Sequence, residues 1–278
     1  MRIAITGSTG QLGQALQEAL AGESLLPLKR PDHDITMLKP LLAAITAFQP
    51  EVIMHTAAMT DVDGCERDPE LAYRVNVLGT RNVALAAQAC GAALVYVSTD
   101  YVFRGDRTEP YWEYDQPDPQ SVYARTKWWG EQVVRDLLTR FYIVRVAWLY
   151  GDGPRNFVKT VLRLASERPV LRMVTDEVGS PTYARDVAHA LARLVCIPAY
   201  GIYHLPNAGV CSRYEWAAEI LRLAGRGDVR LEPTENYPRP ARVPKRVHLH
   251  NVFGSELGLV MRPWREALAD YMERLLHG

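Results

Sequence analysis

Short runs of apolar residues alternate with longer segments of helical periodicity through the first half of the chain. The short runs are almost continuously apolar, which is typical of parallel strands that are buried on both faces. In the segments between them, apolar residues recur three and four positions apart, as one face of a helix requires. The predicted strands are Arg2–Thr6, Ser24–Leu28, Val52–Thr56, Ala93–Val97 and Ile143–Ala147, and the predicted helices are Gln11–Ala21, Met37–Phe48, Pro69–Cys90 and Val122–Leu138.

Strand–helix alternation of this kind predicts an α/β fold with a doubly wound, Rossmann-type parallel sheet, which we expect residues 1–150 to form. Residues 151–278 are less regular, and we expect them to form mostly a small C-terminal lobe, with some segments returning to the sheet. Residues 232–246 contain four prolines and predict a long ordered loop in this lobe. The predicted helices of the second half are Asn156–Glu167, Tyr183–Cys196, Ser212–Ala224 and Trp264–His277.

Composition narrows the class of protein without deciding its function. Lys plus Arg and Asp plus Glu both number 32, so no overall field favours nucleic acid or an anionic membrane. The N-terminus lacks a signal-peptide pattern, and no apolar run approaches the roughly 18 residues that span a bilayer. The four cysteines are scattered without a C-x-x-C pair, which favours reduced thiols over disulfides or a zinc site. We therefore expect a cytoplasmic protein.

Ligands of a parallel, doubly wound sheet bind beyond the carboxyl ends of its strands. In this chain the first predicted strand is followed by Gly7, the third by Ala57 and Ala58, the fourth by Thr99 and the fifth by Trp148. We therefore expect these residues to line one crevice, although they are far apart in the sequence.

The segment from Gly7 to Gly13 carries three glycines, spaced G-x-x-G-x-x-G, between a predicted strand and an amphipathic helix. Glycine permits a tight turn, a close approach of backbone N–H groups to a pyrophosphate, and close packing of helix on sheet. The helix N-terminus adds hydrogen-bond donors and a partial positive charge. This context predicts a dinucleotide site, although a plain strand–helix turn would also use such glycines.

The residues after the second predicted strand indicate which dinucleotide binds. An acidic residue usually stands there and binds the ribose 2′-hydroxyl, whereas this chain has Lys29 and Arg30. Two cations attract a 2′-phosphate, so we predict a preference for NADP(H) over NAD(H). A solvated basic turn is the simpler alternative. Slightly farther on, Asp34 and Ile35 could hold the adenine.

Tyr123 and Lys127 stand four residues apart, so on a helix they share one face. Reducing a carbonyl requires a hydride at carbon and a proton at oxygen, and a tuned phenol can donate that proton. We expect the Lys127 ammonium to lower the pKa of Tyr123 and Thr99 to orient the substrate oxygen. Asp100 follows Thr99 directly, and we expect it either to touch the substrate or only to cap the next loop.

With these residues in hand, the chain resembles the extended short-chain dehydrogenase/reductases and, within them, the dTDP-4-dehydrorhamnose reductase family. The resemblance covers roughly the first two-thirds of the chain, and the segment Ser98–Phe103 is its most specific part. Its segments are Gly7–Gly13, Asp34–Thr36, His55–Asp63, Asn76–Thr80, Ser98–Phe103, Tyr123–Lys127, Trp148–Gly151, Asn156-Phe157 and Val178–Thr182.

The resemblance implies reduction of the C4 keto group of a deoxysugar nucleotide, with Thr99, Tyr123 and Lys127 as the catalytic set. It also implies that the family often accepts both NADPH and NADH. From its irregular pattern we expect the lobe of residues 151–278 to cover and bind the substrate. The substrate-binding residues that the resemblance implies are Val62, Thr99, Asp100, Tyr123 and Trp148. Our full prediction for the cofactor is Gly7, Thr9, Gly10, Gln11, Leu12, Gly13, Lys29, Arg30, Asp34, Ile35, Ala57, Ala58, Met59, Thr60, Tyr123 and Lys127.

Partners and metals follow the same resemblance. It implies a nucleotide-sugar substrate, a homodimer, and in some relatives a divalent ion such as Mg²⁺ at a dimer contact. The residues themselves predict no metal site, because His248 and His250 lack a third candidate ligand. Between Arg239 and Val252 the chain departs from the family pattern by its extra cations, which we expect to close over the nucleotide-sugar and to suit its diphosphate.

Two other functions remain open from the sequence. A nucleotide-sugar epimerase or dehydratase shares the fold and the Y-x-x-x-K pair, but it would retain NAD(H) tightly. A non-catalytic regulatory subunit of the methionine adenosyltransferase type also shares the fold, and the presence of Thr99, Tyr123 and Lys127 together argues against it.

Overall fold

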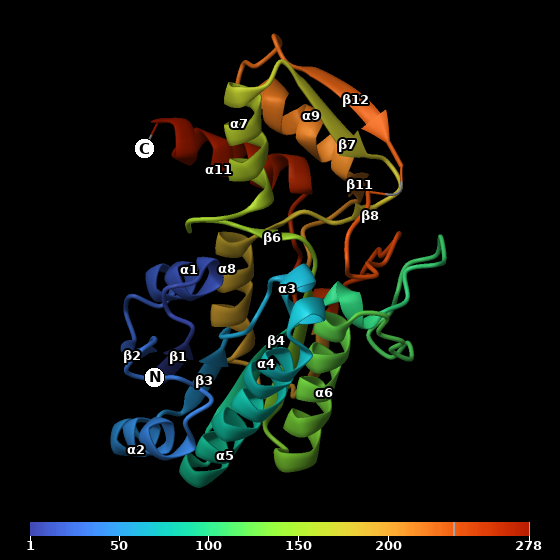
Figure 1. Ribbon diagram of the computed structural model, residues 1–278. Helices are drawn as coiled ribbons and strands as arrows, with labels where there is room; N and C mark the ends of the chain where they lie inside the picture. The colour runs from blue at the N-terminus through green and yellow to red at the C-terminus, as the bar shows by residue number, and fades with distance from the viewer. Residues whose placement is uncertain (236, 278) are drawn as a thin grey trace.

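The computed structural model describes residues 1–235 and 237–277, and its centre is a six-stranded sheet of order β10-β5-β4-β3-β1-β2. Strands β1 to β4 of this sheet are labelled in Figure 1. Each neighbouring pair is parallel. The chain winds one way from β1 to β2 and the other way from β3 onward, so the predicted doubly wound sheet is confirmed. The strands are β1 (Arg2–Thr6), β2 (Ser24–Leu28), β3 (Val52–His55), β4 (Ala93–Thr99), β5 (Phe141–Val146) and β10 (Gly201–His204).

Helices cover both faces of this sheet because each strand is apolar on both sides. One face packs against α1 (Gln11–Ala19) and α8 (Ala184–Leu194), through strand residues such as Ile3 and Ile5. The other face packs against α2 (Leu38–Phe48), α5 (Thr80–Cys90) and α6 (Val122–Leu137). Of the helices in the described part of the chain, none is long and apolar enough to cross a membrane.

The segment predicted as one helix, Pro69–Cys90, consists of α4 (Pro69–Tyr73), a π-helical stretch η1 (Arg74–Gly79) and α5. The predicted extent is confirmed, since these three stretches follow one another without a break. The π-helical stretch was not predicted, because apolar periodicity does not reveal a local widening of the helical turn. The sequence also gave no sign of two short helices, α3 (Val62–Arg67) after β3 and the 3₁₀ turn η2 (Asp100–Val102) after β4.

The C-terminal lobe has an apolar core of its own, which is rich in aromatic rings. It lies among α7 (Phe157–Glu167), α9 (Arg213–Leu223) and α11 (Trp264–His277), at the top of Figure 1. A capping box of Ser212 and Glu215 starts α9. The lobe's remaining elements are β6 (Leu149–Tyr150), β7 (Val170–Val174), β8 (Val178–Gly179), β9 (Thr182–Tyr183), β11 (Cys211–Ser212), β12 (Arg230–Thr234) and α10 (Phe253–Glu256).

The loop predicted over residues 232–246 begins later than expected. Residues 232–234 belong to β12, which pairs in parallel with β7 and includes Pro233. A proline is tolerated there because β12 is an edge strand of a two-stranded sheet. The chain from 242 onward runs beside residues 105–111, with bridges between Asp106 and Arg246 and between Tyr111 and Leu249.

Candidate active site

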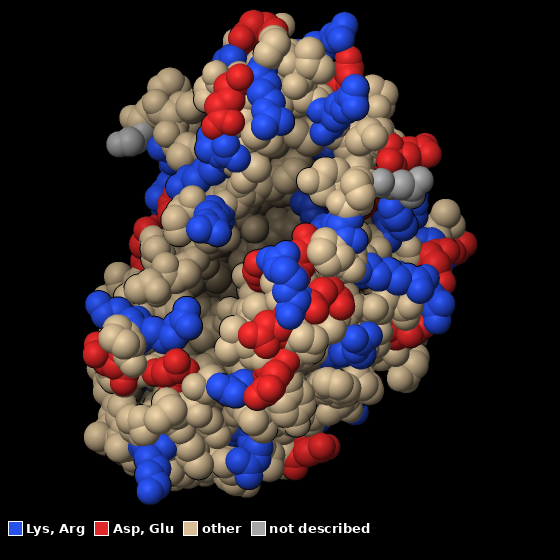
Figure 2. All heavy atoms as spheres, in the orientation of Figure 1, with Lys and Arg blue, Asp and Glu red and all other residues tan. Residues whose placement is uncertain are grey.

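A cleft of about 1010 Å³ lies between the carboxyl ends of the strands and the C-terminal lobe. Figure 2 shows it as a hollow between the lower and upper parts of the molecule, with Lys and Arg side chains near its rim. Its volume is at the upper end of the range for ligand pockets, about 300–1,000 Å³. Apart from Gly13 and the cations of residues 239–252, every residue predicted for catalysis, cofactor binding or substrate binding lines this cleft.

The glycine turn between β1 and α1 forms one wall of the cleft. Gly7 has a φ of +67°, a left-handed conformation that favours glycine. Gly10 is the N-cap of α1 and offers no side chain to the first-turn N–H groups, which leaves them available to an anion. Gly13 lies behind the turn, where an added Cβ would be 2.3 Å from the carbonyl oxygen of Gly7. Its absent side chain therefore serves close packing.

Two cations and a tight loop form the next part of the wall, beyond β2. The side chains of Lys29 and Arg30 are exposed, and neither forms an ion pair within the described residues. Asp34 accepts hydrogen bonds from the backbone N–H and the hydroxyl of Thr36, at 2.9 and 2.8 Å. The carboxylate of Asp34 is thereby held in place, while the two cations remain free to meet an anionic ligand.

The loop after β3, residues 57–60, is held in place by hydrogen bonds to a side chain of the π-helical stretch η1. The buried Asn76 accepts a hydrogen bond from Met59 N at 2.8 Å and donates one to Met59 O at 3.1 Å. Asn76 also donates to the hydroxyl of Thr126 at 3.1 Å, which connects the loop to α6. His55 at the end of β3 contacts Thr6 and Thr80 and is a satisfied core residue.

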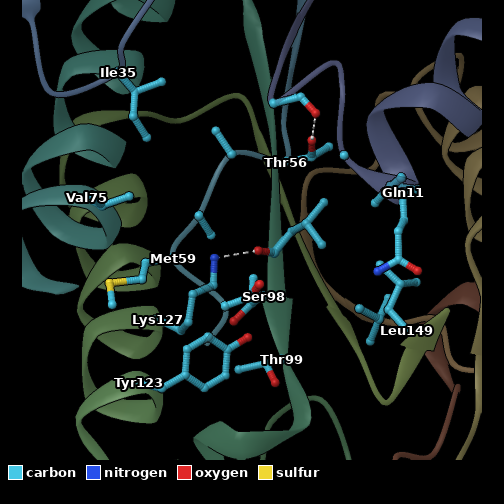
Figure 3. Close-up of a pocket in the computed structure, with 18 of the residues that line it drawn as sticks. Gln11, Ile35, Thr56, Met59, Val75, Ser98, Thr99, Tyr123, Lys127 and Leu149 are labelled. Atoms are coloured by element: carbon cyan, nitrogen blue, oxygen red, sulfur yellow. Dashed lines mark hydrogen bonds between the residues drawn. The ribbon is translucent and has the colours of Figure 1, made fainter. Parts of the chain in front are cut away.

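Tyr123 and Lys127 project from one face of α6 toward the end of β4, where Thr99 stands (Figure 3). Lys127 is buried, and its Nζ donates to the Val97 carbonyl at 2.8 Å. The same ammonium lies 4.2 Å from the centroid of the Tyr96 ring. The three side chains predicted to act together are thus adjacent in the cleft, and they come from two neighbouring elements.

The pKa of Tyr123 moves in the opposite direction from our expectation. Burial raises it above its ordinary value, and a hydrogen bond with Thr99 opposes this rise only in part. Burial lowers the pKa of Lys127 to about 7, with the carboxylate of Glu131 acting in the opposite direction. The expectation was wrong because it counted the charge of Lys127 and left out the cost of burying an ionised phenol.

Asp100 is buried directly after Thr99, and its carboxylate accepts a hydrogen bond from the Thr99 hydroxyl at 3.0 Å. Burial raises the pKa of Asp100 to about 7, against the effects of this hydrogen bond and of Arg213. Thr99, and not Asp100, caps η2 with its side chain, by accepting from Tyr101 N at 3.2 Å. The carboxyl of Asp100 is therefore left to face the cleft.

The far wall of the cleft brings together Trp148 and residues that the sequence did not single out. Arg213, the first residue of α9, places its guanidinium 3.6 Å from the centroid of the Trp148 ring and pairs with Glu177 at 3.5 Å. Trp148 has a φ of +45° and stacks on Trp216. Arg155 also lines the cleft and is exposed. Nothing local in the sequence marks these two arginines, because they come from the lobe.

The cations between Arg239 and Val252 do not face the cleft, contrary to expectation. Arg239 pairs with Asp63 at 3.1 Å, and Lys245 pairs with Asp176 at 2.5 Å. The Asp63 carboxylate also accepts from Ala241 N, so this segment is tied to α3. Within residues 1–235 and 237–277, no three His, Cys, Asp or Glu side chains are grouped so that they could hold a metal ion.

A glycine turn at the sheet's crossover point, a Tyr–Lys pair on α6, and a lobe closing the cleft together define an extended short-chain dehydrogenase/reductase. The chain belongs to the family described as "RmlD substrate binding domain", whose model matches residues 1–277.

Relatives with known names align with nearly the whole chain. It is 40% identical to a dTDP-4-dehydrorhamnose reductase of Mycolicibacterium smegmatis, over 97% of this chain and 84% of the relative. It is 39% identical to the spore coat polysaccharide biosynthesis protein SpsK of Bacillus subtilis, over 98% and 97%. Among solved structures, a dTDP-4-dehydrorhamnose reductase of Bacillus anthracis in complex with NADP matches with a TM-score of 0.95 and 39% identity, over 98% of this chain and 99% of that one.

Proposed function

We propose that this protein reduces the C4 keto group of dTDP-4-dehydro-L-rhamnose with NADPH and yields dTDP-L-rhamnose. The observation that carries the proposal is the meeting of Thr99, Tyr123 and Lys127 in one cleft beside the glycine turn. Relatives named dTDP-4-dehydrorhamnose reductase, up to 40% identical over nearly all of this chain, support the substrate.

The residues of one side of the cleft fit a nicotinamide dinucleotide, and we call residues 7–12, 28–35 and 56–60 the cofactor half. Its free N–H groups at the start of α1 suit a pyrophosphate, and Lys29 and Arg30 suit a 2′-phosphate. NADPH, when bound, supplies the hydride for the reduction. Lys127 lies where its ammonium can hydrogen-bond a ribose hydroxyl as well as the Val97 carbonyl.

Tyr123 donates the proton that the carbonyl oxygen needs. Its raised pKa keeps the phenol protonated at neutral pH, which is the state that a proton donor requires. The oxygen that receives the proton becomes an alkoxide during the reaction, and an alkoxide is much more basic than a phenolate. The proton transfer is therefore favourable, while Thr99 and Lys127 stabilise the charge that remains on Tyr123.

The other side of the cleft fits a nucleotide-sugar, and we call Val62, Asp100, Trp148, Arg155 and Arg213 the substrate half. The Trp148 ring offers a flat apolar surface beside the catalytic group. Arg155 and Arg213 supply the positive charge that a diphosphate needs. The sequence analysis had expected the cations of residues 239–252 to supply it.

The direct test follows NADPH consumption by its near-ultraviolet absorbance, with purified protein and dTDP-4-dehydro-L-rhamnose. Wild-type protein should turn over, and Tyr123→Phe should be slower by about 10²–10⁴-fold with unchanged thermal stability. No turnover by the wild type would contradict the proposal, as would equal rates for the two proteins. Tightly bound NAD(H) after purification, with turnover that needs no added cofactor, would instead favour an epimerase or dehydratase.

Three further expectations go with this proposal and stay predictions. We expect a homodimer, a cytoplasmic location, and no requirement for Mg²⁺ in the chemical step, because proton donation and hydride transfer need no metal at this site. Sedimentation with and without a chelator tests both the dimer and an ion at its contact.

A further inference from the structure

A buried carboxylate lies directly behind the catalytic group, and no step of the proposed mechanism uses it. Glu131 on α6 accepts a hydrogen bond from the Ser98 hydroxyl at 2.6 Å. It also accepts two from Arg145 on β5, from Nε at 2.9 Å and from Nη2 at 2.7 Å. All three side chains are at most 3% exposed. A buried ion pair of this kind costs desolvation energy, so its presence at this place calls for an explanation.

The three members of this cluster occupy the elements that carry the catalytic group. Ser98 immediately precedes Thr99 on β4, and its register partner on β5 is Arg145. Glu131 lies on α6 one turn beyond Lys127 and two turns beyond Tyr123. The hydrogen bonds of Glu131 therefore connect the strand that holds Thr99 to the helix that holds its two partners.

The packing of α6 on β4 is close at the same level. At Gly130 an added Cβ would be 2.2 Å from the Tyr96 hydroxyl oxygen, and that hydroxyl donates to the Lys127 carbonyl at 3.0 Å. The helix can thus approach the strand only because residue 130 has no side chain, and Glu131 then fixes its position. The separation of helix and strand determines how far Tyr123 stands from Thr99.

The charge of Glu131 also acts on Lys127, since residues four apart on a helix are neighbours. The Glu131 carboxylate opposes the loss of the Lys127 proton that burial favours. The other groups that face this pair are Arg145, which bonds Glu131, Tyr96, whose ring lies beside the Lys127 ammonium, and the buried His55, whose pKa burial and the Lys127 charge lower. His204 lies farther away, against Arg145, and burial also lowers its pKa. Glu131 is thus the one carboxylate that acts on Lys127 in the described part of the chain.

We propose that Glu131 is a positioning residue for the reduction. Held by Ser98 and Arg145, it sets the distance between Thr99 and Tyr123 and keeps a negative charge one helical turn from the Lys127 ammonium. This inference rests on the proposed function, because it assigns Glu131 a task in the same reaction. The alternative is that the cluster only stabilises the fold.

The experiment compares three variants with the wild type, by pH profiles of kcat and KM and by thermal unfolding. Glu131→Gln keeps the shape of the side chain and removes its charge. Ser98→Ala removes one hydrogen bond and leaves the ion pair intact, so it folds even if the first variant does not. Asp186→Asn is the matched control, because Asp186 on α8 also accepts one amide and two arginine hydrogen bonds, from Asn207 and Arg262, away from the cleft.

We expect Glu131→Gln to lower kcat about 10–100-fold with KM changed less than about 2-fold, because orientation and charge matter most in the transition state. The basic limb of its pH profile should move down by about one pH unit, since Lys127 loses its proton more readily. Ser98→Ala should lower kcat about 5-fold. Asp186→Asn should lower the unfolding temperature and leave kcat and the basic limb unchanged.

Unchanged kcat and pH profile in both Glu131→Gln and Ser98→Ala would overturn the proposal. So would an equal change in Asp186→Asn, which would show a general effect of lost stability. If Glu131→Gln does not fold, the kcat of Ser98→Ala decides alone. The pH dependence of NADPH binding, followed by protein fluorescence, should show the same shift without turnover. If the wild type binds NADPH but reduces no keto sugar, the proposed function fails, while this shift still tests the role of Glu131.

Discussion

The two halves of the cleft are built by different physical means. The cofactor half consists largely of backbone: a glycine turn, the start of α1, and a loop that Asn76 fixes through main-chain atoms. The substrate half consists of side chains that are charged, aromatic or strained, such as Asp100, Trp148 and Arg213. The first half depends on the shape of the chain, whereas the second depends on electrostatics that burial makes costly.

This difference determines which changes should impair ligand binding in each half. A backbone site tolerates pH changes but not added atoms, because its groups do not titrate and its spaces are closed. A site of charged side chains, of which Asp100 is buried, tolerates small changes in shape but responds to pH and to charge. Substitutions in each half can therefore test the contrast between them.

The largest expected effect concerns Asp100 in the substrate half. Its pKa rises from 3.8 to about 7, so ionising Asp100 destabilises the folded protein. The shift corresponds to a loss of as much as about 4 kcal/mol in the free energy of unfolding. A carboxyl with a raised folded pKa contributes no penalty at low pH and destabilises the fold as the pH rises toward 7. We expect Asp100→Asn to be more stable than the wild type by up to that amount above about pH 7, with the gain vanishing near about pH 4.

Denaturant unfolding of both proteins across this pH range measures the difference. A constant difference at all pH values would show that Asp100 does not titrate as its burial implies. Asp34→Asn is the control in the cofactor half, because the Asp34 carboxylate is only half-buried and already bonded to Thr36. It should show no comparable gain at neutral pH.

The second prediction concerns the closed space behind the glycine turn. A Cβ at Gly13 would lie 2.3 Å from the carbonyl oxygen of Gly7 and 2.7 Å from Cα of Ser8, and both are backbone atoms that cannot move aside. We expect Gly13→Ala to lower the free energy of unfolding by about 3 kcal/mol and to weaken NADPH binding. Gly22→Ala, at a site with open space around it, is the matched control. Calorimetric titration with NADPH and thermal unfolding would measure both effects, and equal behaviour of the two variants would contradict the steric account.

The same contrast explains how much of the molecule could be predicted from its sequence. The cofactor half follows from local patterns, because a strand, a glycine turn and an amphipathic helix are contiguous between residues 2 and 19. The Tyr123–Lys127 pair was also local, being spaced by one helical turn. Most of the cleft's predicted lining residues were found because parallel strands end at a common edge.

The substrate half could not be predicted to the same extent. Arg213 faces Trp148 only because the C-terminal lobe places the start of α9, just after the β11–β8 pair, beside residue 148, and no periodicity encodes that contact. The cations of residues 239–252 were misassigned because sequence cannot show that Arg239 is already paired with Asp63. The raised pKa of Tyr123 was missed for a similar reason, since burial is a property of the assembled cleft.

The third prediction tests Arg213, whose guanidinium bonds Glu177 and covers Trp148. If it holds the substrate's diphosphate, Arg213→Met should raise KM for the nucleotide-sugar about 30-fold, because a charged hydrogen bond contributes about 2 kcal/mol. The dissociation constant of NADPH should change less than about 2-fold, since Arg213 lies in the other half. A loss of NADPH affinity as large as the rise in KM would contradict the assignment of Arg213 to the substrate half alone.

The smallest effect is expected for Lys29 and Arg30, the charged side chains with which the cofactor half would bind NADPH. Lys29 and Arg30 are exposed and form no ion pair with the residues that the structure describes, so solvent screens them. Each should contribute about 1 kcal/mol to binding a 2′-phosphate. Arg30→Ala should therefore weaken NADPH binding about 5-fold, leave NADH binding unchanged, and lose its effect in high salt. Arg168→Ala, which removes another exposed arginine at the end of α7, should change neither affinity. If Arg30→Ala weakens NADH and NADPH equally, the cation acts on the pyrophosphate or on the loop, and the preference for NADPH must come from elsewhere in the cleft.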